Sequence, residues 1–181
     1  MTTASKITMI RIFLLPVFFV LMLVDFPGHT WWALGVFILS SVTDTLDGHV
    51  ARKYDQVSDF GKFIDPLADK LLVVAALLIF VSNGQMPSWA AMVIITREFA
   101  VTGLRLIAVE NGVVIAAAKS GKIKTVVSLI GICLMLTPWH DASLVGAFDI
   151  DWLVTVLMLI TTVYSGVEYF VKNGKLLNLG R

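Results

Sequence analysis

The sequence predicts an all-α integral membrane protein whose six transmembrane helices enclose a polar cavity open to the cytoplasm. Of its 181 residues, 57% are hydrophobic and 15% are charged, which is too polar-poor for a soluble domain of this length. The hydrophobic residues form long blocks, and about 20 apolar helical residues suffice to cross a bilayer core. Acidic residues interrupt two consecutive blocks, which predicts the polar cavity.

The hydrophobic blocks are too long for ordinary strands and therefore favour helices. The expected spans are Met9–Phe26, Trp31–Arg52, Gly61–Val81, Ser88–Glu110, Lys122–Pro138 and Trp152–Val171. Turn-forming pairs separate several of them, namely Pro27-Gly28, Asn83-Gly84 and Asn111-Gly112. We interpret residues 1–181 as one domain, with an interfacial segment over Met1–Thr8 and a short cytoplasmic tail over residues 172–181.

The basic residues can all be assigned to one side of the membrane. With six spans, the fourteen Lys and Arg residues fall at the two termini and around the second and fourth connections. The other three connections contain only acidic charges, at Asp25, Asp141, Asp149 and Asp151. The positive-inside rule then predicts a multi-pass plasma-membrane protein with cytoplasmic termini and a cytoplasmic active site. The net charge of +1 indicates no nucleic-acid partner.

Several residues within or beside the spans have structural interpretations. The single cysteine, Cys133, rules out an internal disulfide. Tryptophans near the predicted outer ends are expected to form an interfacial belt, and they are Trp31, Trp32, Trp89, Trp139 and Trp152. Glycines within spans are expected to allow close helix packing, and they are Gly35, Gly103, Gly131 and Gly166.

Charges inside apolar spans are costly and are usually functional, and here they are concentrated in one stretch. At about 100° per residue, one face of the second span presents two carboxylates, two very small residues and a neighbouring guanidinium. These residues are Asp44, Asp47, Gly48, Ala51 and Arg52. The third span has Asp65 and Asp69 at i, i+4 spacing, with Gly61 on the same face. If the two spans are neighbours, four carboxylates converge.

Four converging carboxylates favour a bound divalent cation, because like charges in contact would otherwise force some to be protonated. Oxygen ligands suit Mg²⁺, Mn²⁺ or Ca²⁺. A metal, carboxylates and an arginine form an arrangement suited to phosphoryl transfer, and Gly48 and Ala51 leave room for a nucleotide. In the alternative, the aspartates form a salt-bridge network with Arg52, Lys62 and Lys70, which would not require two small residues between the charges.

The stretch from Asp44 to Asp69 resembles the signature of the CDP-alcohol phosphotransferase family, D-x2-D-G-x2-A-R-x8-G-x3-D-x3-D, at all eight fixed positions over 26 residues. That family transfers a phosphatidyl group, or a similar substituted phosphate, from a CDP-linked donor to an alcohol and releases CMP. The resemblance extends to the six-span layout. It implies Mg²⁺ or Mn²⁺ as cofactor, as two ions, and a homodimer in a bacterial plasma membrane.

The resemblance also implies roles for the motif residues. Asp44, Asp47 and Asp65 would be metal ligands, and Asp69 would be the general base and a further metal ligand. The residues implied to hold the CDP part of the donor are Asp44, Asp47, Gly48, Ala51, Arg52 and Gly61.

Three further stretches, Lys6–Arg11, Thr96–Arg105 and Gly121–Thr125, resemble the bacterial family members that use glycerol 3-phosphate as the acceptor. A physical argument agrees, because metal and an arginine already serve the donor diphosphate and other cations remain for an acceptor phosphate. These cations are Arg97, Arg105, Lys122 and Lys124. All but Arg97 could instead be inner-flank charges that face lipid headgroups. Arg97 lies too deep in its span to reach the surface.

We therefore expect transfer from CDP-diacylglycerol, which enters laterally from the membrane lipids, to sn-glycerol 3-phosphate, which arrives from the cytoplasm. Asp69 would accept the proton of the acceptor's 1-hydroxyl. One alternative is a sister enzyme whose acceptor is inositol phosphate, serine or phosphatidylglycerol. Another is a divalent-cation transporter, although the outer halves of the second and third spans are apolar except for Ser40, Ser41 and Thr43.

Overall fold

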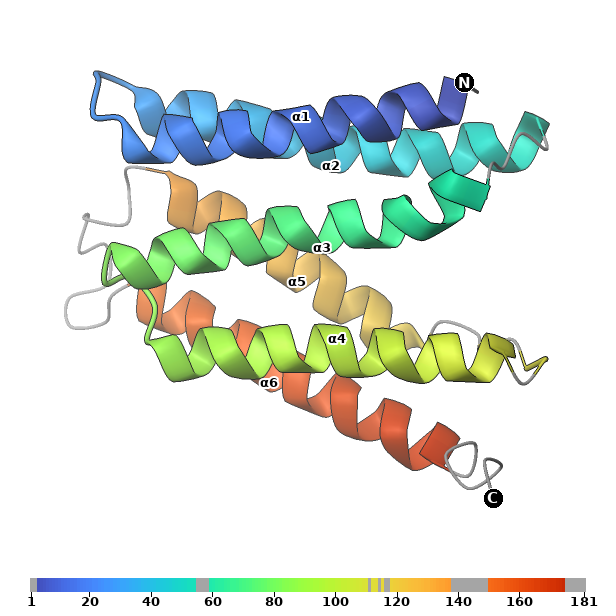
Figure 1. Ribbon diagram of the computed structural model, residues 1–181. Coiled ribbons are helices and arrows are strands. Elements are labelled where there is room, and N and C mark those ends of the chain that lie inside the picture. The colour runs from blue at the N-terminus through green and yellow to red at the C-terminus, as the bar shows by residue number, and fades with distance from the viewer. Residues whose placement is uncertain are drawn as a thin grey trace.

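A computed structural model of the chain contains six helices and, within the residues it describes, no strand (Figure 1). The described residues are 3–54, 59–110, 112, 113, 115, 118–137 and 150–174, with side chains described for all of these except 3–11, 44–69 and 110. The helices are α1 (Thr3–Leu23), α2 (His29–Tyr54), α3 (Asp59–Ser82), α4 (Ser88–Glu110), α5 (Lys119–Leu136) and α6 (Ile150–Asn173).

Each predicted span coincides with one helix, so the all-α, six-helix part of the prediction is confirmed. The ends differ by a few residues. The largest difference is at α1, which begins at Thr3 and so includes most of the segment that was expected to be interfacial. Three predicted turns are also confirmed. Gly28, Gly84 and Gly112 have φ of 81°, 76° and 73°, in the left-handed region that glycine adopts at little steric cost.

The helices run up and down, so that the two connections rich in Lys and Arg lie at the same end of the bundle (Figure 1). This basic end holds the start of α1, the end of α6, the end of α2, the start of α3, the end of α4 and the start of α5. The α1–α2 and α3–α4 turns lie at the opposite end. The fold therefore places the termini and the basic connections together, as the charge pattern requires.

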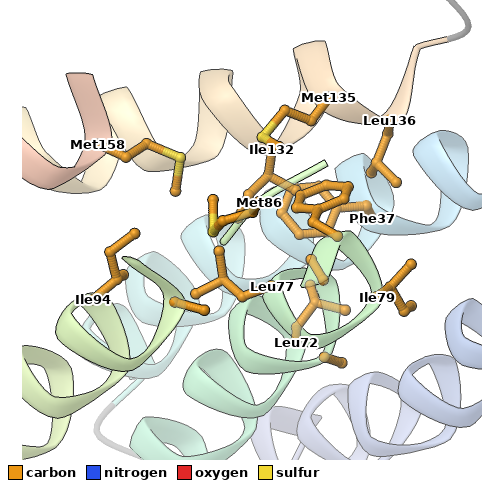
Figure 2. Close-up of a cluster of buried hydrophobic side chains, with 14 of the residues drawn as sticks. Phe37, Leu72, Leu77, Ile79, Met86, Ile94, Ile132, Met135, Leu136 and Met158 are labelled. Atoms are coloured by element: carbon orange, nitrogen blue, oxygen red, sulfur yellow. The ribbon is translucent and has the colours of Figure 1, made fainter. Parts of the chain in front are cut away.

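The larger apolar core lies toward the end opposite the basic end. Figure 2 shows several of its buried side chains. Phe37 of α2, Leu77 of α3 and Ile132 of α5 are buried there, together with Met86 of the α3–α4 turn. Burial of such side chains is the usual source of helix-packing stability, at about 1.5–3 kcal/mol each. A second, smaller apolar cluster, Val101, Leu104 and Tyr169, lies nearer the basic end.

The predicted packing role of the span glycines is confirmed at Gly131 and Gly166, whereas Gly35 and Gly103 have no packing partner among the described atoms of this chain. A Cβ at Gly131 would lie 2.9 Å from Val154 Cγ1, and one at Gly166 would lie 3.1 Å from Arg97 Cγ. Close approach to α6 therefore requires glycine on α5, and α6 itself needs glycine to accommodate α4. At Gly35 and Gly103 a Cβ would meet no described atom within 4 Å, because both face away from neighbouring helices of this chain.

The outer surface is strongly apolar. Large hydrophobic side chains are exposed on all six helices, and Phe13 of α1 and Val171 of α6 are 76% and 77% exposed. A soluble monomer rarely shows such continuous apolar surface, whereas a membrane protein requires it. Exposed tryptophans also begin α2, α4 and α6 at the end opposite the basic end, at Trp31, Trp32, Trp89 and Trp152. Trp139 lies outside the described residues.

By length, hydropathy and charge alone, one helix within the described residues, Ile150–Asn173, could cross a membrane. Ile12–Leu23 and Lys70–Ser82 are shorter apolar helical stretches. Six crossings and a cavity open to the cytoplasm thus stay predictions, whereas the six helices are observed.

Candidate active site

The acidic motif occupies two consecutive helices, as predicted. Asp44 and Asp47 lie in α2, and Asp65 and Asp69 lie in α3, in the halves of these helices nearest the basic end (Figure 1). The two helices contact each other. The remaining motif residues lie in the same helices, and they are Gly48, Ala51, Arg52 and Gly61. The motif side chains lie outside the described part of the structure, so metal and donor binding by them stay predictions.

Among the described side chains, no group of three or more His, Cys, Asp or Glu could hold a metal ion. The motif carboxylates stay the predicted metal ligands, and the i, i+4 spacing of Asp65 and Asp69 in α3 is that of residues on one helix face. An oxygen-only ligand set of this kind fits a hard cation such as Mg²⁺ or Mn²⁺.

A second polar group, the Glu98 cluster, joins four helices. It consists of Lys70 of α3, Arg97, Glu98 and Thr102 of α4, Lys124 of α5 and Ser165 of α6. Its centre is one carboxylate oxygen. Oε1 of Glu98 accepts from Nη1 of Arg97 at 2.9 Å and from Nζ of Lys124 at 2.5 Å. Two cations of different helices thus meet at a single atom.

Lys70 links this cluster to the acidic motif, because it directly follows Asp69 in α3. Its ammonium donates to the hydroxyl of Thr102 and, at 3.4 Å, to the backbone carbonyl of Glu98. The Thr102 hydroxyl donates to the same carbonyl at 2.8 Å. From the sequence, Lys70 is expected to be a flank charge or a partner of the aspartates. The periodicity of a single helix does not show that Lys70 contacts α4.

Arg97 is held firmly against α6. Its Nη2 donates to Ser165 Oγ at 2.5 Å, and its side chain is only 13% exposed. Gly166 leaves the space that the arginine's aliphatic part fills. The prediction that Arg97 is buried inside its span is confirmed. Its Nε is buried and makes no hydrogen bond to the described atoms, so its donors are not all satisfied.

The cluster has more positive than negative charge among its described side chains. Lys70, Arg97 and Lys124 surround one carboxylate, that of Glu98, and Lys124 is only 3% exposed. Arg105 adds a fourth cation within electrostatic range of Lys70. Uncompensated charge away from water is unfavourable. A cluster of this composition is therefore suited to bind an anion.

The fold separates the four cations that were predicted to bind the acceptor. Arg97 and Lys124 both bind Glu98. Arg105 instead donates from Nε to the Tyr169 hydroxyl at 2.7 Å. Lys122 is exposed on α5, on the opposite side of that helix from Lys124, since two residues correspond to about 200°. The prediction that each binds a phosphate is untested.

Comparison with known proteins gives one consistent family. The family model of CDP-alcohol phosphatidyltransferase matches residues 1–166. A Bacillus subtilis protein named CDP-diacylglycerol–glycerol-3-phosphate 3-phosphatidyltransferase is 44% identical, over 93% of each chain. A Mycobacterium tuberculosis protein named as a probable phosphatidylglycerophosphate synthase is 34% identical, over 93% of this chain and 80% of that protein. A Haemophilus influenzae protein with the first of these names is 32% identical, over 95% and 94%.

Proposed function

The chain belongs to the CDP-alcohol phosphatidyltransferase family, and from that premise we propose that it transfers the phosphatidyl group of CDP-diacylglycerol to sn-glycerol 3-phosphate. The products would be phosphatidylglycerophosphate and CMP. The names of the similar proteins from Bacillus subtilis and Haemophilus influenzae state both substrates. In each comparison the matched region covers more than nine-tenths of both chains, which supports the same complete activity for this chain.

The observation that carries the choice of acceptor is that, among the described side chains, three cations, Lys70, Arg97 and Lys124, adjoin the single carboxylate of Glu98. Arg97 and Lys124 are buried in a bundle where burying each charge is expensive. A phosphate on the acceptor would compensate them, and charge-assisted hydrogen bonds to phosphate are strong. Serine or an uncharged alcohol has no phosphate and would not compensate the charges of Arg97 and Lys124. Lys70 belongs to the cluster and directly follows Asp69 in α3. The acceptor hydroxyl would react at Asp69.

The motif residues would carry out the transfer. Asp44, Asp47, Asp65 and Asp69 would hold Mg²⁺ or Mn²⁺, as two ions, and the metal would neutralise the donor diphosphate. Arg52 would hold phosphate oxygens of the CDP part beside the small residues Gly48 and Ala51, and Gly61 would leave similar room on α3.

Proton transfer is assigned to Asp69. Its carboxylate would accept the proton of the acceptor's 1-hydroxyl, the oxygen would attack the phosphorus that bears diacylglycerol, and CMP would leave in line. Arg97 and Lys124 would orient the acceptor through its own phosphate, at the far end from the reacting hydroxyl.

The apolar exterior supports a multi-pass protein of the bacterial plasma membrane with six crossings. The basic end would face the cytoplasm, together with both termini and the polar cavity. The lipid donor would enter sideways between helices, and the soluble acceptor would enter from the cytoplasm. We also propose a homodimer, on the basis of the family resemblance.

The test is acceptor-dependent release of CMP from purified protein with labelled CDP-diacylglycerol and Mg²⁺ or Mn²⁺. Glycerol 3-phosphate, inositol phosphate, serine and phosphatidylglycerol would be compared at equal concentration. We expect release with glycerol 3-phosphate well above the others. Preference for inositol phosphate would keep the phosphate site but change the acceptor, and preference for serine would reject both. Divalent-cation flux in vesicles without CMP release would support the transporter alternative.

A further inference from the structure

We propose that Glu98 is a positioning residue that holds Arg97 and Lys124 as a pair of donors for the acceptor phosphate. The inference rests on the proposed function, because it concerns the same acceptor site. The signature motif does not include Glu98, which directly follows Arg97 in α4. Its position among the cations of three helices gives it this role.

The distances around Glu98 support a positioning role for its carboxylate. Arg97 Nη1 and Lys124 Nζ both bind Oε1 of Glu98, at 2.9 and 2.5 Å. Two nitrogens that share one oxygen are close enough for one phosphate to contact both. Lysine side chains are otherwise conformationally free and arginine side chains are long. The carboxylate therefore brings together donors from α4 and α5 in a defined arrangement.

Charge balance gives the same result. Without the carboxylate, Arg97 and Lys124 would repel each other at short range, and Lys124 is 3% exposed and would lose its only counter-charge among the described side chains. With it, Lys70, Arg97 and Lys124 still outnumber the acidic groups among the described side chains of the cluster. Glu98 thus allows the cations to gather without neutralising the site.

The main chain of Glu98 extends the arrangement to a third helix. Its carbonyl oxygen accepts from Lys70 Nζ at 3.4 Å and from Thr102 Oγ1 at 2.8 Å. The residue therefore contacts cations from α3, α4 and α5 through its side chain or backbone. A substitution that changes only the carboxylate leaves the carbonyl contact intact, so the side-chain role can be tested separately.

The test is Glu98→Gln, which keeps the shape and removes the charge, compared with Glu98→Asp, which keeps the charge on a shorter side chain. Glu168→Gln is the matched control, because Glu168 pairs with Lys172 within α6 and outside the cluster. Loss of a charge-assisted contact is worth roughly a ten- to hundredfold change. We expect Glu98→Gln to raise KM for glycerol 3-phosphate by about tenfold, with KM for CDP-diacylglycerol unchanged. Glu98→Asp should recover part of the loss, and the control should match the wild type.

A double-mutant cycle separates positioning from general destabilisation. If Glu98 acts through Lys124, then Lys124→Gln should cost much less acceptor affinity in the Glu98→Gln protein than in the wild type. Additive losses, equal losses for both substrates, or an unchanged or lower acceptor KM in Glu98→Gln would overturn the inference.

A second readout does not depend on the reaction. Inorganic phosphate should raise the melting temperature of the purified wild type and Glu168→Gln proteins in detergent, and raise it less for Glu98→Gln. An equal shift in Glu98→Gln would reject the positioning role. Wild-type protein that shows no activity with glycerol 3-phosphate would reject the proposed function instead, and the phosphate shift would still decide the role of Glu98.

Discussion

The guanidinium of Arg105 is fixed on Tyr169 by two contacts, a hydrogen bond of 2.7 Å from Nε to the phenol oxygen and a position 5.3 Å from the ring centroid. Tyr169 is 2% exposed, and Val101 and Leu104 pack with it. The end of α6 thereby orients a cation of α4. Such a contact would restrict where the remaining Arg105 donors can point.

Tyr169→Phe keeps the ring and removes the hydrogen bond. We expect KM for glycerol 3-phosphate to rise by about two- to tenfold, the scale of one neutral or weakly assisted hydrogen bond. Arg105→Gln should raise it further, and adding Tyr169→Phe to Arg105→Gln should then change it little. Steady-state kinetics with both substrates would measure this. A large effect of Tyr169→Phe in the Arg105→Gln protein would show that the tyrosine acts independently.

Lys122 and Lys124 provide a matched pair on one helix. Lys124 is buried against Glu98 and Lys122 is exposed. Lys124→Gln should raise KM for glycerol 3-phosphate by roughly ten- to a hundredfold, and Lys122→Gln should change it much less. The same assays with varied CDP-diacylglycerol are the control, since donor KM should stay constant. If both substitutions raised KM for glycerol 3-phosphate equally, the acceptor would have to contact both sides of α5.

The proposed division of labour in the motif predicts different defects for Asp44 and Asp69. Asp44→Asn should weaken both metal and donor binding. Asp69→Asn should retain donor binding while turnover falls by about 10²–10⁴, the usual scale for a positioned base. Donor binding titrated against Mg²⁺ or Mn²⁺ would distinguish the two variants. Complete loss of donor binding in Asp69→Asn would indicate that the carboxylates act as a single metal site.

The topology prediction concerns which end of the bundle faces the cytoplasm. In a Cys133→Ala background, cysteines at Asn83 or Ser88 should react with an impermeant maleimide in intact cells. Cysteines at Lys119 or Lys172, at the basic end, should react only after permeabilisation. Gly84 is a poorer site, because its φ of 76° would strain a cysteine. Labelling of Asn83→Cys only from the cytoplasm would reverse the assigned orientation.

Gly131 and Gly103 predict opposite outcomes for the same substitution. Gly131→Ala would place a Cβ 2.9 Å from Val154 and 3.0 Å from Met158, so overpacking should cost about 1–3 kcal/mol and lower the melting temperature. Gly103→Ala meets no described atom within 4 Å and should be neutral or slightly stabilising in a helix. Thermal unfolding in detergent would compare them. A destabilised Gly103→Ala protein would indicate that this face packs against another molecule.

The sequence by itself determined the helices and the motif, because both depend on local properties. Long apolar blocks specify helix positions, and glycines such as Gly28 and Gly84 allow the left-handed turns between them. The spacing from Asp44 to Asp69 places the motif on two consecutive helices without reference to the rest of the fold. The depth of Arg97 followed from its position along one span.

Only the tertiary structure decided which helix faces meet. Periodicity shows that Lys122 and Lys124 point in opposite directions, but the packing of α5 against α6, α2 and α3 decides that Lys124 is the buried one, within reach of Glu98 of α4. It also decides that Glu98 accepts hydrogen bonds from both Arg97 and Lys124. Contacts between helices depend on rotation and close approach, which are set by distant residues such as Gly131 and Gly166. The residue pattern of a single helix does not show how that helix is rotated or how closely it approaches its neighbours.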